Sequence, residues 1–221
     1  MLRIFAFLIL VIIAVAGYGW YSAQSLPSWF DDQTSQEDQA AKALSQKIKQ
    51  QGVSKFLGSK VGQVLKGKVT FSEIEFNAIM LASLKADEDG RKLLAVSDAV
   101  KAFIKKDQLE ISAIINLDKV EKIDPKARQA VEKFDRLFPF LNESRMAISV
   151  YGTPIARNGN LAIKDDFHIK VGAIPISNSA LRQLGAKVER ANTSDLPIKY
   201  LSVRGVTLKD GEIELTVLPR F

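Results

Sequence analysis

Residues 68–84 read KVTFSEIEFNAIMLASL and carry the sharpest local pattern in the chain behind its N-terminal segment. A capping box fits at a strand-to-helix corner here, formed either by Thr70 with Glu73 or by Ser72 with Glu75. The helix predicted after the corner is apolar nearly all round, so it must be covered on several sides or face an apolar ligand. Asn77 is its polar exception. We expect a satisfied buried amide that ties the helix to a neighbouring loop, and a ligand contact is the less favoured alternative.

Residues 108–118 alternate between apolar and polar side chains. Only Ile114 interrupts the polar side, and the apolar side, expected to point inward, consists of Leu109, Ile111, Ala113, Ile115 and Leu117. This period of two predicts a long antiparallel strand with one face in solvent.

Further strand and helix patterns surround these two segments. Apolar residues at helical spacing predict helices near residues 41–52, 57–67 and 125–138, and a short helix is expected after Pro175. Asn158-Gly159 and Asp210-Gly211 are hairpin signals, and Gly205 shifts the apolar parity of its strand, which predicts a bulge. Strands alternating with isolated helices, without βαβ spacing, predict an α+β fold. We expect a curved antiparallel sheet packed against several helices.

The N-terminal segment predicts a membrane anchor. Residues 4–21 contain no charge, and 18 residues of helix span roughly 27 Å, close to the thickness of a bilayer core. Aromatic residues cluster at its far end, as is typical of a membrane interface. Arg3 precedes the span and acidic residues follow it, which predicts a cytoplasmic N-terminus. We therefore expect a transmembrane signal-anchor over residues 1–21, a stalk over 22–36 and an extracytoplasmic domain over 37–221.

Two alternatives to the anchor are open. A cleaved signal peptide could use Ala14-Val15-Ala16 as its small-residue site, although the apolar run continues beyond it. A buried core helix is disfavoured, because such helices rarely lie at a terminus between a basic and an acidic flank.

Residues 39–72 contain seven lysines and no acidic residue. The other residues have a net charge of 6 − 7 = −1, so these lysines supply the whole net charge of +6. They are Lys42, Lys47, Lys49, Lys55, Lys60, Lys66 and Lys68. One interpretation is attraction to the anionic headgroups of the membrane lipid bilayer, worth about 1 kcal/mol per lysine at the surface. The favoured alternative is the solvated face of two amphipathic helices. Nucleic-acid binding is not expected, since an outward-facing domain would meet no nucleic acid and the segment forms no basic patch with regularly interleaved aromatic residues.

Composition excludes several kinds of chemistry. The 221 residues include no cysteine, which excludes disulfides, a thiol nucleophile, iron–sulfur centres and cysteine-bound zinc. A single histidine, His168, excludes a multi-histidine metal centre, and we expect it on a strand surface. Asp165 and Asp166 are adjacent, so on a strand they point to opposite faces. No phosphate loop, nucleophile elbow or metalloprotease motif is present. We predict no catalytic residue, no metal site and no cofactor.

The order of these parts resembles the YpmS-like single-span bacterial envelope proteins. The resemblance rests on residues 71–77 (FSEIEFN), on residues 172–176 (GAIPI) and on the order of elements over residues 1–185. Phe76 stands where leucine is more usual in that group. The resemblance implies a place in the bacterial inner membrane and a module that holds apolar chains between a curved sheet and a long helix. The implied ligand wall is Ile74, Ala78, Leu81 and Leu84 on the helix, facing Leu109, Ile111, Ala113 and Ile115.

Three functions follow as hypotheses. The first is non-catalytic binding of a lipid or another apolar ligand by an anchored extracytoplasmic module. The second is a structural or assembly role with an envelope protein partner. A hydrolase is the least favoured. Composition alone does not separate the first two, because apolar residues that line a cavity look like apolar residues that fill a core.

Overall fold

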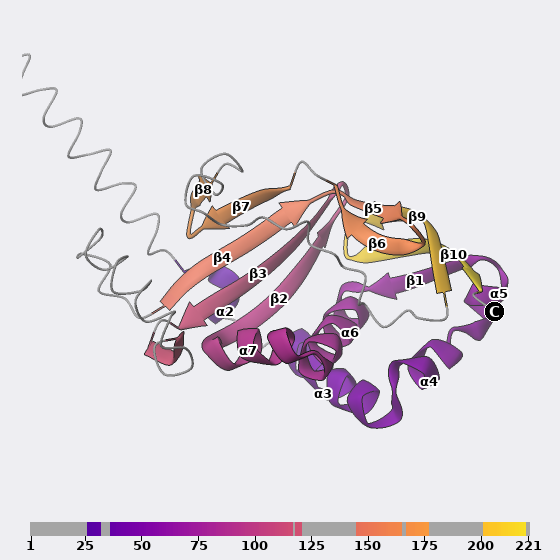
Figure 1. The fold of residues 1–221 in the computed structure, drawn as a ribbon, viewed down its shortest axis with the longest axis horizontal. Coiled ribbons are helices and arrows are strands. Elements are labelled where there is room, and N and C mark those ends of the chain that lie inside the picture. Colours follow the sequence, from indigo (N-terminus) through magenta and orange to yellow (C-terminus); the bar gives the residue numbers. More distant parts are fainter. Residues whose placement is uncertain are drawn as a thin grey trace, which may run out of the picture.

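The described part of the chain forms three antiparallel sheets and a set of helices. The computed structural model describes residues 26–31, 36–116, 118–120, 145–164, 167–176 and 201–219. The sheets have five, three and two strands. Figure 1 shows the five-stranded and three-stranded sheets displaced along the long axis, with α6 lying between them. The α+β class and the antiparallel pairing are thereby confirmed, whereas the expectation of a single sheet is wrong.

The helices that precede the corner follow the sequence pattern in part. Helix α3 (Gln36–Gln51) ends where predicted, at Gly52, which has a φ of 82°. The predicted helix over residues 57–67 is instead divided into α4 (Val53–Gly58) and α5 (Val61–Leu65). Val61 and Leu65 are exposed, so the apolar residues at helical spacing in this segment do not all pack against the core.

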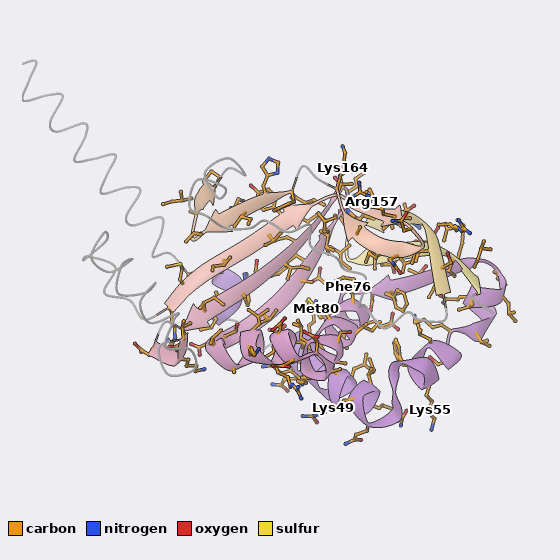
Figure 2. All side chains as sticks on the ribbon, in the orientation of Figure 1. Lys49, Lys55, Phe76, Met80, Arg157 and Lys164 are labelled. Atoms are coloured by element: carbon orange, nitrogen blue, oxygen red, sulfur yellow. The ribbon has the colours of Figure 1, made fainter. Side chains whose placement is uncertain are left out.

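The strand-to-helix corner forms as predicted, with the second of the two capping boxes. Strand β1 (Lys68–Ser72) runs directly into α6 (Glu73–Ala86). The Ser72 hydroxyl accepts from the Glu75 N–H at 3.3 Å, and the Glu75 carboxylate accepts from the Ser72 N–H at 3.0 Å. Helix α7 (Glu88–Val96) follows, capped by Asp87. Phe76 and Met80 of α6 belong to the buried core (Figure 2).

The five-stranded sheet has the order β2-β3-β4-β7-β8, so β2 is an edge strand. Its strands are β2 (Ser97–Lys105), β3 (Gln108–Asn116), β4 (Arg145–Gly152), β7 (His168–Val171) and β8 (Ile174–Ile176). The strand predicted at residues 108–118 is confirmed as β3. Its predicted solvent face is wrong, because Ser112 and Ile114 on that side are fully buried.

The two smaller sheets contain the predicted hairpins. In the order β1-β10-β9, strands β9 (Leu201–Lys209) and β10 (Glu212–Pro219) meet at Gly211, with a φ of 75°. The bulge expected at Gly205 is present, since the register shifts opposite Thr216 and Val217. Asn158 and Gly159 both have positive φ, and they join β5 (Pro154–Arg157) to β6 (Asn160–Ile163). The later strand β7 pairs with β4 of the five-stranded sheet.

Helix α6 is fixed along the open edge of β2 by two side chains. Asn77 is 5% exposed; its Oδ1 accepts from the Ala102 N–H at 2.7 Å and its Nδ2 donates to the Ala102 carbonyl at 2.8 Å. The Glu73 carboxylate accepts from the Ile104 N–H at 2.8 Å. The buried amide is confirmed, although its partner is a strand and not a loop. These bonds satisfy edge groups that would otherwise lack partners.

The segment predicted as a stalk is partly packed on the domain. Within it, α2 (Ser28–Asp31) places the Trp29 ring 5.7 Å from that of Phe103, and the Arg145 guanidinium lies 5.7 Å from the Phe30 ring. The predicted anchor at residues 1–21, the predicted helices at 125–138 and after Pro175, and Leu117 lie outside the described residues. Among the described helices, none has the length and apolar character needed to span a membrane.

Replacing Asn77 with alanine is expected to lower the free energy of unfolding by about 2–4 kcal/mol, because both backbone groups of Ala102 lose their buried partner. Urea denaturation of the full chain measures the change. The matched control is Asn116→Ala, since that half-buried amide lies 3.5 Å from Asp98 and its loss is expected to cost less than about 1 kcal/mol. Equal losses in the two variants would contradict the role assigned to Asn77.

Candidate functional site

One face of the five-stranded sheet carries two unbroken apolar rows. Cross-strand partners share a face, so the register places Val100, Ala113, Ile148, Val171 and Ile174 in one row. The second row consists of Ala102, Ile111, Val150 and Ile169. We call these nine residues the apolar sheet face.

The apolar sheet face is fully buried only where it reaches the helices. Ala102 has no exposed surface, whereas Ile148, Val150, Ile169 and Val171 are half-buried. In the described part of the chain, α6 and α7 pack against the sheet mainly through the edge strand β2 (Figure 1). The two apolar rows therefore continue from β2, which these helices contact, onto β3, β4 and β7.

The opposite face carries two largely polar rows, Lys101, Ser112, Ser149 and Lys170, and Phe103, Glu110, Tyr151 and His168. A further row on that face, Ala99, Ile114 and Ala147, is apolar. The hydroxyls of Ser112 and Ser149 are 2.6 Å apart and buried. His168 is exposed and stacks on Tyr151 with ring centroids 5.3 Å apart. Burial raises the pKa of Glu110, but hydrogen bonds from Lys105 and Ser112 outweigh it and hold that pKa below its ordinary value.

The predicted ligand wall is divided among three places. Ala78 and Leu109 belong to the buried core, and Leu84 and Ile111 pack against it. Leu81 lines a separate pocket beside β2. Ala113 lies on the apolar sheet face, and the alternation of β3 places Ile115 on the same side. Ile74 is half-buried at the start of α6. Part of the helix half and part of the β3 half therefore share the buried core, whereas Leu81 and Ala113 lie in other places.

Sequence reasoning did not assign Ile148, Val150, Ile169 and Val171 to a site. Their alternation within each strand is visible in the sequence, at residues 146–150 and 167–171. The pairing of β4 with both β3 and β7 brings them beside Ala113 and Ile111. That pairing joins segments far apart in the chain, and no local pattern specifies it.

A pocket of about 310 Å³ lies where α3 and α6 meet β2. Its lining mixes Leu81 and Trp29 with cationic and acidic side chains. Lys101 is neutralised there by Asp38 at 2.9 Å. Asp98 accepts from the Lys119 Nζ and from the Arg145 Nε, each at 2.7 Å. The hydrogen bond from Lys119, which outweighs the effect of burial, holds the pKa of Asp98 below its ordinary value.

The seven predicted surface lysines do not share one environment. Lys60 is 13% exposed; its Nζ lies 2.9 Å from Glu75 and donates to the Thr70 carbonyl at 2.8 Å, so it acts inside the fold. Lys68 is 64% exposed and pairs with Glu214 at 2.8 Å. The remaining five are exposed: Lys42, Lys47, Lys49, Lys55 and Lys66. Figure 2 shows Lys49 and Lys55 pointing away from the body of the molecule.

The described residues contain no group of three or more histidine, aspartate or glutamate side chains placed to hold a metal ion. Asp165 and Asp166 lie outside those residues.

Comparisons of the chain with protein-family models, with curated proteins and with solved structures gave no match. All nine side chains of the apolar sheet face are aliphatic, so they offer apolar contact and no side-chain hydrogen bond.

Asp98 predicts a pH dependence of stability. Its folded pKa is lower than its unfolded value, so its contribution is fully present above an ordinary pKa of 3.8 and is lost as the pH falls through the lower folded value. We expect Asp98→Asn to be less stable than the parent chain at neutral pH, and the difference to shrink in acid below that ordinary value. Urea denaturation at several pH values measures it. A difference that does not change with pH would contradict the assignment.

Proposed function

We propose that this chain is a membrane-anchored, extracytoplasmic module that binds a lipid or another apolar ligand without catalysing a reaction. The proposal rests on the apolar sheet face, whose rows run unbroken across the strands and remain half-buried on β4 and β7. The ligand lies against Ala113, Ile148 and Val150. The predicted resemblance to the YpmS-like proteins is consistent with this proposal.

Burial supplies the binding energy in this proposal. Each 100 Å² of apolar surface removed from water contributes about 2.5 kcal/mol, so no catalytic or charged residue is needed to hold the ligand. Five strands enclose four spacings of about 4.8 Å, which makes a row roughly 19 Å long. An extended acyl chain laid across the strands matches a surface of this length and chemistry.

Photo-crosslinking in bacterial cells separates a lipid ligand from an envelope protein partner. Benzoylphenylalanine in place of Ile148 is expected to give, after illumination, an adduct of lipid mass on the full chain, because its ring lies on the apolar sheet face. The control replaces Lys170, whose neighbours are on the polar face. Mass spectrometry of the purified chain reads the adducts. A protein adduct at position 148 in place of a lipid would favour the assembly role and overturn the proposal.

Filling the apolar sheet face is a second test. We expect Ala113→Trp to reduce the lipid adduct at position 148 severalfold, because the indole occupies the space of the ligand. The free energy of unfolding should change by less than about 1 kcal/mol, since overpacking costs of 1–3 kcal/mol apply to filled cores. If the variant loses that larger amount of stability, the face is filled by the chain itself and the ligand proposal fails.

The proposed location has its own test. An alkaline phosphatase fused after residue 221 is expected to be active, because that enzyme requires an oxidising compartment and the proposed topology leaves only the N-terminus in the cytoplasm. A matched fusion lacking residues 1–21 should be inactive. Activity that is independent of residues 1–21 would contradict the proposed anchor.

A further inference from the structure

Three exposed apolar side chains come from α5 and from the end of β10, two elements that contact each other. Leu65 is 78% exposed, Val61 is 55% exposed and Leu218 is 49% exposed. Val61 and Leu65 are four residues apart on α5, so they lie on the same side of that helix. Val64, between them, instead packs against the core. We call Val61, Leu65 and Leu218 the apolar tip.

Backbone pairing joins the two parts of the apolar tip. Helix α5 packs against β1 and β10, and the Val217 N–H donates to the Gly67 carbonyl at 2.9 Å. This bond brings Leu218 beside the turn that follows α5. The side chain of Gln63 accepts from the Thr70 N–H at 3.0 Å and fixes the helix to β1. The tip is therefore a surface held on ordered elements.

The surroundings of the apolar tip are basic. Residues 53–68 include four lysines and no acidic residue. Lys66 follows Leu65 directly and is exposed, and Lys55 is exposed on α4. The nearest acidic group on the paired strand is Glu214, which Lys68 already neutralises at 2.8 Å. The tip therefore combines exposed apolar side chains with the positive charge of Lys55 and Lys66, which no ion pair among the described residues compensates.

We propose that the apolar tip is a docking surface for a lipid bilayer that carries anionic headgroups. Apolar side chains that enter the headgroup region, flanked by lysines that attract anionic lipids, are the usual elements of peripheral membrane binding. Figure 1 places α5 at one end of the long axis, away from α2, the first described element. This surface is separate from the apolar sheet face, and the inference requires neither the proposed ligand nor the proposed anchor.

A fluorescent label tests the docking directly. The chain has no cysteine, so Leu65→Cys can be labelled at that position alone with an environment-sensitive nitrobenzoxadiazole dye. The full chain, held in neutral phosphatidylcholine nanodiscs, is mixed with vesicles of equimolar phosphatidylglycerol and phosphatidylcholine. We expect a blue shift and a rise in emission. The control label is at Leu93→Cys on α7, a residue that is 36% exposed outside the tip, and it should not respond.

Several results would overturn the proposal. No response at position 65 would exclude a lipid surface and leave the tip to a protein partner. Equal responses at positions 65 and 93 would show non-specific adsorption. A response of the same size to pure phosphatidylcholine vesicles would show that the lysines do not select anionic lipid.

A vesicle co-flotation assay with unlabelled variants measures how much each side chain contributes to binding the anionic vesicles. Leu65→Gln combined with Val61→Gln is expected to weaken binding to the anionic vesicles about 10- to 100-fold, whereas Leu93→Gln should leave it unchanged. Lys66→Gln should weaken it about 5-fold at low salt and less at high salt. Because these side chains are exposed, the variants should fold as the parent does, and unchanged binding in the double variant would contradict the proposal.

Discussion

The arrangement of this protein depends on how α6 closes the edge of β2. An edge strand presents backbone groups that need partners, and Asn77 supplies both a donor and an acceptor to Ala102. The Glu73 carboxylate, one turn earlier on the same helix, accepts a hydrogen bond from the Ile104 N–H. These bonds hold the helix beside the sheet edge and not across its face. The continuation of the apolar sheet face onto β4 and β7 is a consequence of that placement.

The same placement explains why α6 has no polar side. The helix contacts α3 and α7, the strands β1 and β10 of one sheet and the strand β2 of another. A helix surrounded in this way buries most of its circumference, and the capping box at Ser72 sets the angle at which it leaves β1. The sequence allowed two explanations for this apolar helix: coverage on several sides, or contact with an apolar ligand. The contacts show coverage on several sides, which explains the helix without a ligand. The proposed ligand surface is accordingly on the strands.

Features set by neighbouring residues could be predicted, and features set by distant pairing could not. The Ser72–Glu75 box, the end of α3 at Gly52 and the Asp210-Gly211 turn each depend on a few consecutive residues. Strand β2 was not predicted, because the apolar Phe103 lies between Ala102 and Ile104 and interrupts the alternation. The alternation of β3 placed Ile111 and Ala113 on its apolar side, and the resemblance to the YpmS-like proteins implied that they belong to a ligand wall. Their neighbours on β4 lie 35 and 39 positions away in the chain, and β4 in turn pairs with residues of β7 that lie 19 and 23 positions further on.

The apolar sheet face and the apolar tip differ in a way that bears on what each can bind. The rows of the sheet are held at fixed spacing by backbone hydrogen bonds and are half-buried, which suits one extended chain lying across the strands. The tip projects from a five-residue helix and is mostly exposed, so it offers little enclosure to a single molecule. It can bury its area only against a broad surface. The lysines near the tip also differ in role. Lys60 stabilises the strand-to-helix corner through its ion pair with Glu75, whereas Lys66 is exposed beside Leu65.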